Sequence, residues 1–427
     1  MVNSDSAPTG QRSRKLAWIA GAVALVLLLL ALSLRFALQP ERVTGLILDR
    51  VGSALGLEIT ASSTGEYRLR GTPTLVVRNV VAREPGAATP LLRADRIFLS
   101  LPWSTIRARG SDLTVNRIEI ERPLLDLDAL QHWLDRRPPG KTRIPTLTDG
   151  LRVRDGTIVT AGWTLTEVAL ELPTLHPGQR VNARTSGRYR SGSVQAPFAL
   201  DVVLSQPAAD AALGIAGQIG IERERWRIPA RVVLSGMLHL GNGWRLDRAR
   251  LAAVARYVSG DTDLPFVLGM AGTLRHVDGR LGLVPAGIAV RGDSPIPDID
   301  AHGAVALADA LELQLTGSLQ AWPEAWPTLP PPIGESQSPL PFALQYTGNS
   351  DFSDIAALQL RRDAARFDGR FRLPDVTAWI DAAAGGSPLP PLDGRVTTPG
   401  LEISGAQLEG VEITLDEPDV PDVDGTP

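Results

Sequence analysis

Apolar and polar residues alternate at every second position over most of this chain, and no other feature constrains the fold as strongly. Successive side chains of a β-strand point to opposite faces of the sheet, so the alternation predicts strands with one apolar and one polar face. We therefore predict a fold that is mainly β. Three of the clearest runs carry apolar residues at the following positions: Ile97, Leu99 and Leu101; Val168, Leu170 and Leu172; Leu311, Leu313 and Leu315.

Short turn signals separate these runs. The dipeptides Asp155-Gly156, Asp278-Gly279, Asp368-Gly369 and Asp393-Gly394 are typical of the tight turns that join antiparallel strands. At ~10 residues per strand and turn, about 350 residues give more than ~20 strands, beyond the size at which open sheets curl or split. We predict a long curved antiparallel β-sheet, shaped as an open groove or trough, with a few short helices.

Several segments depart from the alternation. Residues 43–55, 124–134, 246–258 and 376–384 have the spacing or composition of helices. Residues 322–341 contain seven prolines, and proline can continue neither a helix nor a central strand. We expect a linker or a capping strap there.

The N-terminal region predicts a membrane anchor. Residues 16–34 form an uncharged apolar run whose length, at ~1.5 Å per residue, matches the hydrocarbon core of a bilayer. More basic residues precede this run than follow it, which predicts a cytoplasmic N-terminus and export of the rest. A cleaved signal peptide is the alternative, but the apolar run is longer than that of a typical signal peptide and Arg35-Phe36-Ala37 is a poor cleavage site. We expect a retained single-pass signal anchor over residues 16–38.

These features divide the chain into consecutive segments. We predict a cytoplasmic N-terminus (1–15), a transmembrane signal anchor (16–38), a helix plus β segment (40–136), a central β-sheet segment (137–320), a proline-rich linker or strap (321–341), a C-terminal β segment (342–415) and a disordered acidic tail (416–427).

Composition argues against several classes of function. The chain has no cysteine, which excludes disulfides, thiolate metal sites and cysteine nucleophiles. Its net charge of −4 argues against nucleic acid as the main ligand. The five histidines lie far apart, and we find no serine elbow or dinucleotide-binding glycine motif. We predict a protein that is not an enzyme and has no catalytic residue, cofactor or metal.

A curled sheet leaves its apolar residues lining an interior groove, and an apolar groove beside a bilayer suits an acyl chain. The predicted lipid-contacting residues are therefore the three alternating runs named above. A pair of β-sandwich domains is the structural alternative, in which the same residues form closed cores.

Several motifs resemble the AsmA-like family of bacterial envelope proteins. The predicted helix ERVTGLILDRVGSALGLEI is followed by RGTPTLVVRNVVAREP, LLRADRIFLSLPWSTI and DLTVNRIEIERPLLDLDAL, in the order found in that family. Pro73-Thr74-Leu75, Asn79-Val80, Ala94-Asp95 and Pro123-Leu124-Leu125 match its strand motifs, whereas His132 stands where the family often has Asn. The resemblance covers residues 16–135, and the C-terminal part is similar to the ends of AsmA-like chains.

The resemblance implies a periplasmic β-groove rooted in the bacterial inner membrane and related to bridge-like lipid transfer proteins. Its expected ligand is phospholipid or another acyl-chain lipid, carried toward the outer membrane or used in outer-membrane assembly, with a protein partner in the periplasm or outer membrane. The alternative function is an anchored assembly or secretion-machinery subunit that binds protein partners through its strand edges.

Overall fold

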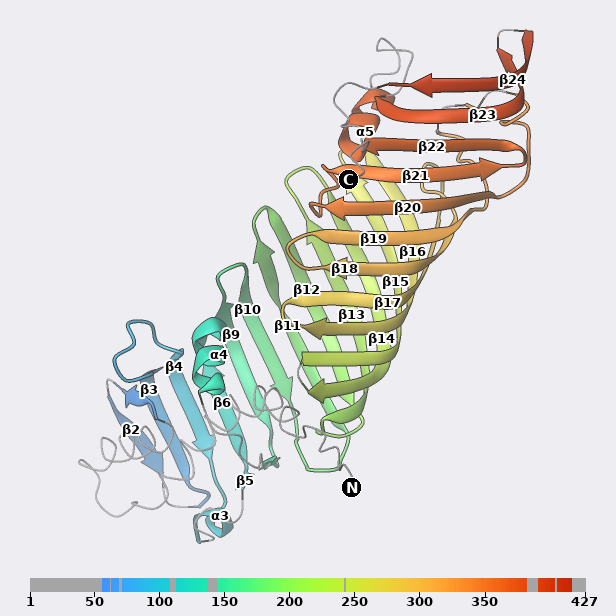
Figure 1. Cartoon of the computed structure of the whole chain (residues 1–427). Coiled ribbons are helices and arrows are strands. Elements are labelled where there is room, and N and C mark those ends of the chain that lie inside the picture. The colour runs from blue at the N-terminus through green and yellow to red at the C-terminus, as the bar shows by residue number, and fades with distance from the viewer. Residues whose placement is uncertain are drawn as a thin grey trace, which may run out of the picture. The chain divides into compact units, whose positions relative to one another are not determined.

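The computed structural model describes residues 56–61, 63–68, 71–107, 113–136, 144–241, 243–326, 328–329, 331–381, 391–403 and 405–416. The predicted anchor (16–38), the predicted helix at 43–55 and the tail beyond Asp416 lie outside the described residues. Within the described ranges, no helix has the length and apolar character needed to cross a bilayer. The fold is mainly β with a few short helices, as predicted (Figure 1).

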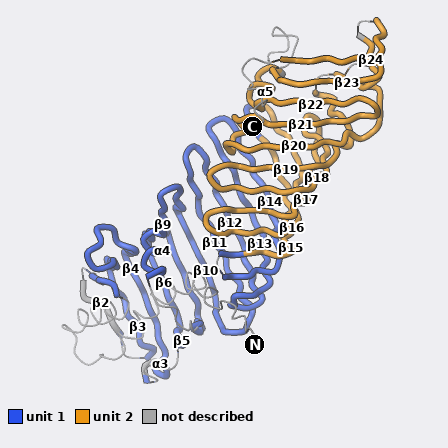
Figure 2. The backbone as a smooth tube through the Cα atoms, viewed as in Figure 1, with its two compact units in different colours: residues 1–244, 258–260 blue, residues 245–257, 261–427 orange. Residues whose placement is uncertain are grey.

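The chain divides into two compact units (Figure 2). Unit 1 comprises residues 1–244 and 258–260, and unit 2 comprises residues 245–257 and 261–427. The described helices of unit 1 are α3 (Trp103–Arg107) and α4 (Leu127–Asp135). Its strands are β1 (Glu58–Thr60), β2 (Ser63–Arg68), β3 (Thr74–Arg83), β4 (Leu92–Ser100), β5 (Thr114–Val115), β6 (Arg117–Glu121), β7 (Leu124–Asp126), β8 (Thr146–Leu147), β9 (Leu151–Val159), β10 (Thr164–Leu172), β11 (Val181–Ser191), β12 (Val194–Leu204), β13 (Asp210–Glu222) and β14 (Arg227–Gly241).

Unit 2 also consists mainly of strands. Its described helix is α5 (Leu373–Asp381), and it contains residues 245–257 of strand β15 (Gly243–Ser259). The remaining strands are β16 (Thr262–Val277), β17 (Arg280–Gly292), β18 (Ile299–Leu307), β19 (Leu311–Leu319), β20 (Leu340–Gly348), β21 (Ile355–Arg362), β22 (Ala365–Arg372), β23 (Leu392–Ile403) and β24 (Ala406–Leu415).

The sheet of unit 1 is mixed, which corrects the antiparallel prediction. Strands β9 to β14 pair antiparallel with their neighbours in sequence. However, β9 pairs parallel with both β6 and β7, and β5 pairs parallel with β8. Parallel neighbours need a long crossover rather than a tight turn. Helix α4 and the segment after it supply that crossover between β7 and β9.

Helix α4 begins at a well-formed cap. Asp126 occupies the N-cap position, and its carboxylate accepts a hydrogen bond from the Ala129 amide at 2.9 Å. The helix buries Leu130, Trp133 and Leu134 on one face. Those side chains pack into a hydrophobic core together with residues of β3, β4 and β6, so this part of unit 1 has a closed core.

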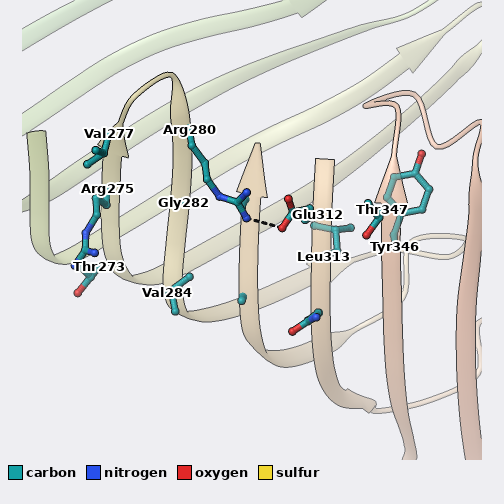
Figure 3. A pocket seen from close by; sticks show the side chains of 13 residues that line it. Thr273, Arg275, Val277, Arg280, Gly282, Val284, Glu312, Leu313, Tyr346 and Thr347 are labelled. Atoms are coloured by element: carbon teal, nitrogen blue, oxygen red, sulfur yellow. Dashed lines mark hydrogen bonds and ion pairs between the residues drawn. The ribbon is translucent and has the colours of Figure 1, made fainter. Parts of the chain in front are cut away.

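In unit 2, β16 to β24 form an antiparallel meander in which each strand pairs with the next. This part of the antiparallel prediction is confirmed. The strands from β16 to β20 bend along their length, in agreement with the predicted curvature (Figure 3). Asp278 and Gly279 both have positive φ and form the predicted tight turn between β16 and β17.

The predicted helix at residues 246–258 is wrong, because the segment lies in strand β15. The buried residues of this strand are Leu246, Ala249, Ala253 and Ala255. The first three of them are spaced i, i+3 and i+7, as on one face of a helix. Arg248 has a φ of 51°, a left-handed conformation typical of a β-bulge. A bulge adds one residue to the alternation, which explains how a strand acquired the spacing of a helix.

Three predicted turns lie inside strands instead. Asp155-Gly156 lies in β9, Asp368-Gly369 in β22 and Asp393-Gly394 in β23. Gly369 and Gly394 are direct cross-strand partners, and a Cβ on Gly369 would come within 2.3 Å of the Phe367 ring. Gly369 therefore leaves room for the Phe367 ring. Gly394 lets the two strands approach closely, because a Cβ there would come within 2.7 Å of the Asp368 carbonyl oxygen.

The proline-rich segment forms a strap between β19 and β20. Among its described residues, none between Gln320 and Pro339 belongs to a helix or strand. The Trp322 and Trp326 rings meet edge to face at 4.9 Å, and Trp326 Nε1 donates a hydrogen bond to the Pro295 carbonyl at 3.0 Å. The Glu402 amide of β23 donates to the Pro331 carbonyl at 2.8 Å. We call residues 320–339 the strap.

Candidate apolar binding face

The first predicted run is buried in the closed core of unit 1. Ile97, Leu99 and Leu101 are 9%, 4% and 4% exposed. They belong to the same core as Ile118 and Trp133. In this segment the structure has the closed core that was the alternative to a groove, and these three residues form no accessible surface.

The second predicted run is intermediate in its burial. Val168, Leu170 and Leu172 of β10 are all partly exposed, and Leu172 packs against the core of unit 1. Glu167 has a φ of 57°, and the register of β10 against β9 shifts on both sides of Val168. The alternation is therefore irregular here, and only Leu170 and Leu172 continue it.

The third predicted run lies on a broad apolar surface of unit 2. Leu311, Leu313 and Leu315 of β19 face the same side of the sheet and remain partly exposed. Leu313 is the cross-strand partner of Val305 on one side and of Tyr346 on the other. Leu315 pairs with Leu344, which continues the row onto β20.

The register extends this surface over eight strands, from β17 to β24. Alternating positions that face the same side as Leu313 are mostly apolar in each strand. We call this surface the apolar face of unit 2. Its partly or fully exposed hydrophobic members are Leu281, Ile288, Val290, Ile299, Val305, Leu307, Leu311, Leu313, Leu315, Phe342, Leu344, Leu358, Leu360, Phe367, Phe371, Leu392, Val396, Val411, Ile413 and Leu415.

The opposite side of the same strands is polar. On β19 it carries Glu312, Gln314, Thr316 and Ser318, between the leucines. Ion pairs cross the strands on this side, including Arg280 with Glu312 at 2.5 Å and Arg395 with Glu412 at 3.1 Å. Both partners of each pair are well exposed, so these pairs contribute little to stability. The sheet of unit 2 therefore has one polar, solvent-exposed face and one apolar face.

A hollow of about 510 Å³ lies among strands β16 to β20 of unit 2 (Figure 3). Figure 3 shows the Arg280 and Glu312 side chains pointing toward one another across it. Leu313 and Tyr346 also line the hollow, together with small and β-branched residues. Such a mixed lining can hold an amphipathic group. Of the residues that the sequence singled out, Leu313 alone lines this hollow.

Tyr346 anchors the end of β20. Its ring is 3% exposed, and its hydroxyl donates a hydrogen bond to the Asn349 carbonyl at 2.5 Å. Burial raises the pKa of Tyr346 above its ordinary value. The phenol therefore stays neutral at physiological pH and serves packing rather than proton transfer.

The strap is pinned to the turn between β21 and β22. Ser338 Oγ donates to Asp363 Oδ1 at 2.6 Å, and the Arg362 guanidinium donates to the Ser336 carbonyl. Hydrogen bonds from Ser336 and Ser338 lower the pKa of Asp363, and the positive charge of Arg362 acts in the same direction. Sequence reasoning missed this contact because it joins residues about 25 positions apart through their side chains.

The lowered pKa of Asp363 predicts that acid loosens the strap. Carboxylates with a lowered pKa stabilise the fold above their ordinary pKa of about 3.9, and this stabilisation is lost as the pH falls further. Because the chain has no cysteine, a fluorophore on Glu335→Cys reports the strap alone. We expect its signal to change below about pH 4. Asp363→Asn should abolish that transition and the exposed control Asp368→Asn should keep it; an unchanged transition in Asp363→Asn contradicts the assignment.

The described residues offer no metal site, because none of their histidine, aspartate and glutamate side chains gather in a group of three that could hold an ion. Comparisons with protein-family models, with curated proteins and with solved structures found no match for this chain.

Proposed function

We propose that this chain is a non-enzymatic lipid-binding protein of the bacterial envelope, and that acyl chains of phospholipid lie on the apolar face of unit 2. The observation that carries the proposal is the partial exposure of that face across eight consecutive strands. Soluble proteins rarely leave a contiguous apolar surface of this kind uncovered unless it binds something.

The size of the face fits an acyl chain. Eight strands have seven intervals, which at ~4.8 Å each span roughly 34 Å. A phospholipid acyl chain reaches about half of the ~30 Å bilayer core, so the face can hold an extended chain across its strands. Each methylene of the acyl chain that leaves water contributes about 0.8 kcal/mol to the free energy of binding. The face can therefore bind an acyl chain without hydrogen bonds to it.

The side chains of the face favour lipid over a folded protein partner. They are leucine, valine, isoleucine and phenylalanine. Arg362 and Thr398 share this side of the sheet but are buried, and the polar residues of β19 lie on the opposite side. Protein interfaces need hydrogen-bonding groups at a density of about one per 100–200 Å², whereas hydrocarbon needs none. A surface of leucine, valine, isoleucine and phenylalanine side chains is therefore better matched to a mobile acyl chain.

The proposal places the predicted anchor (16–38) in the inner membrane and the bulk of the chain in the periplasm. The positive-inside asymmetry of the N-terminus supports this orientation. The protein would take phospholipid from the inner membrane and conduct or hold it on its way to the outer membrane, or support outer-membrane assembly with a partner there.

A second candidate function is binding of a protein partner through a strand edge. Strand β24 pairs only with β23 among the described strands, and Leu408 on it is 44% exposed. An unpaired edge can accept a further strand from another chain. This contact is compatible with lipid binding, because it uses the edge of the sheet rather than its apolar face.

Photo-crosslinking in cells tests which side of the sheet contacts lipid. A benzophenone amino acid at Leu344 lies on the apolar face, and the same group at Gln345 lies on the polar face one residue away. We expect lipid adducts at position 344 to exceed those at 345 by about tenfold, the ratio that a difference of ~1.4 kcal/mol produces. Equal yields, or protein adducts at position 344, would contradict the proposal.

A further inference from the structure

Two neighbouring hairpins of unit 1 concentrate positive charge at one rim of its sheet. They join β11 to β12 and β13 to β14, and they lie side by side because Gln195 of β12 is the cross-strand partner of Glu222 of β13. Their tips, residues 188–197 and 220–229, contain five arginines and two glutamates, a net charge of +3 in a chain whose net charge is −4. We call these two segments the arginine rim.

Most of this charge is available to a partner. Arg190, Arg225 and Arg227 are exposed, and none of them forms an ion pair with a described carboxylate. The ion pair within the rim joins Arg188 to Glu222 at 3.4 Å. The register places Arg190, Glu222 and Arg227 in one row on the same side of the sheet. A local excess of exposed cations attracts an anionic partner.

The opposite side of the rim is apolar. Tyr189 pairs with Ala196 and Ile221 pairs with Ile228, each one residue away from the arginine row on its strand. Ile221 is 41% exposed. The ring of Trp163, in the hairpin before β10, lies against that of Tyr189 with the centroids 5.9 Å apart. The rim therefore has guanidinium groups on one side and aromatic or aliphatic side chains on the other.

Hydrogen bonds align the tips of neighbouring hairpins. Ser191 Oγ donates to the Gly162 carbonyl at 3.1 Å, which ties the turn after β11 to the turn before β10. Ser259 Oγ donates to the Arg225 carbonyl at 3.0 Å, at the turn between β13 and β14. The charged and aromatic side chains therefore form an extended row along the hairpin tips.

An anionic lipid surface fits this row better than an acidic protein does. Tryptophan and tyrosine are enriched where a membrane meets water, because one end of the side chain is apolar and the other is polar. The Arg223 guanidinium lies over the Trp226 ring at 5.9 Å from its centroid, so this tip also combines both kinds of group. An extended surface with charged and apolar sides can meet phosphates and the hydrocarbon boundary together.

We propose that the arginine rim docks unit 1 onto an anionic lipid surface, with its exposed arginines on the lipid phosphates and its apolar side at the headgroup boundary. Two surfaces share this chemistry: the membrane that holds the predicted anchor (16–38) and a second membrane opposite to it. The contact is independent of acyl-chain binding, because it uses lipid headgroups and residues of unit 1.

The first arm of the test holds the full-length chain in nanodiscs of phosphatidylcholine, a lipid without net charge. Because the chain has no cysteine, an environment-sensitive fluorophore on Ser193→Cys reports the exposed turn between β11 and β12 alone. Vesicles of equal parts phosphatidylglycerol and phosphatidylcholine are then added, with pure phosphatidylcholine vesicles as the reference. We expect the anionic vesicles to shift the emission to the blue, and high salt to abolish the shift.

The rim variant combines Arg190→Gln, Arg225→Gln and Arg227→Gln. At about fivefold per arginine near an anionic surface, its affinity for anionic lipid should fall about 100-fold. The matched control removes the same charge from exposed sites outside the rim, at Arg93→Gln, Arg361→Gln and Arg366→Gln, and should bind as the wild type does. Circular dichroism checks that both variants are folded.

The second arm replaces the nanodisc lipid with the same phosphatidylglycerol mixture and adds no vesicles. A blue shift that requires the rim arginines then assigns the contact to the membrane that holds the chain. A shift that appears only when anionic vesicles are added assigns it to an opposing membrane. Poly-glutamate, added to the neutral nanodiscs, is the probe for an acidic protein partner.

Three results would overturn the proposal: an emission that anionic lipid leaves unchanged in both arms, a folded rim variant that binds like the wild type, and a matched control that loses binding equally. If poly-glutamate shifts the emission through the rim arginines and anionic lipid does not, the partner is an acidic protein and the membrane assignment is wrong. Lipid held on the apolar face of unit 2 is measured separately, so the proposed function stands or fails independently of this result.

Discussion

Leu99→Asp is expected to unfold unit 1. The Leu99 side chain is 4% exposed and packs within the closed core beside Ile97 and Ile118. Loss of a buried leucine alone costs about 2–5 kcal/mol, and an unpaired buried carboxylate adds a penalty of several kcal/mol. The sum is comparable with the whole stability of a typical domain, about 5–15 kcal/mol.

Circular dichroism and limited proteolysis of the full-length chain measure this effect. The matched control is Arg93→Gln, on the same strand β4 but exposed to solvent, which should change stability by no more than about 0.5 kcal/mol. A Leu99→Asp protein that folds normally and has only lost a bound lipid would show that this core is a ligand site, contrary to the structure.

Leu313→Asp is expected to have the opposite consequence, a folded protein that has lost its lipid. Leu313 lies at the centre of the apolar face, between Val305 and Tyr346, and remains partly exposed. A carboxylate there keeps access to water, so we expect a loss of about 1–3 kcal/mol of stability rather than unfolding. An acyl chain in contact with it would have to desolvate the charge, which should lower lipid occupancy at least about tenfold.

The lipid that copurifies with the full-length chain, together with its unfolding temperature, tests this expectation. Gln314→Asp places the same charge one residue away on the polar side of β19 and should leave both quantities unchanged. Wild-type lipid occupancy in a folded Leu313→Asp protein would exclude the apolar face as the binding surface.

These two substitutions show what the sequence pattern could and could not predict. The alternation around Leu99 and around Leu313 is the same, and in both cases it correctly predicted a strand with one apolar face. The pattern does not reveal what covers that face. In unit 1 the cover is helix α4, whose Leu130 and Trp133 close the core, whereas the face around Leu313 stays partly exposed.

The failures of the pattern have local physical causes. A left-handed residue at Arg248 added one position to β15 and gave a strand the spacing of a helix. Glycine leaves room for the Phe367 ring at Gly369 and for the neighbouring backbone at Gly394, although an Asp-Gly pair usually signals a turn. Local sequence cannot distinguish these uses of glycine, because the atoms that require it belong to a neighbouring strand.

Arg362 was invisible to sequence reasoning for a related reason. It ends an ordinary alternating strand, and the sequence offers no motif around it. Its burial comes from the strap, through contacts with residues such as Ser336 that precede it by 26 positions. Only the folded arrangement of the strap shows that this arginine is buried.

Native mass spectrometry of the full-length chain tests the central claim most directly. The protein would be extracted from its membrane in a maltoside detergent, released from the micelle in the gas phase and weighed together with whatever remains bound. Lipid binding predicts a folded chain that carries phospholipid, and a Leu313→Asp chain whose lipid occupancy is at least about tenfold lower. A wild-type chain without lipid, bound instead to a protein partner, would contradict this account and favour an assembly subunit.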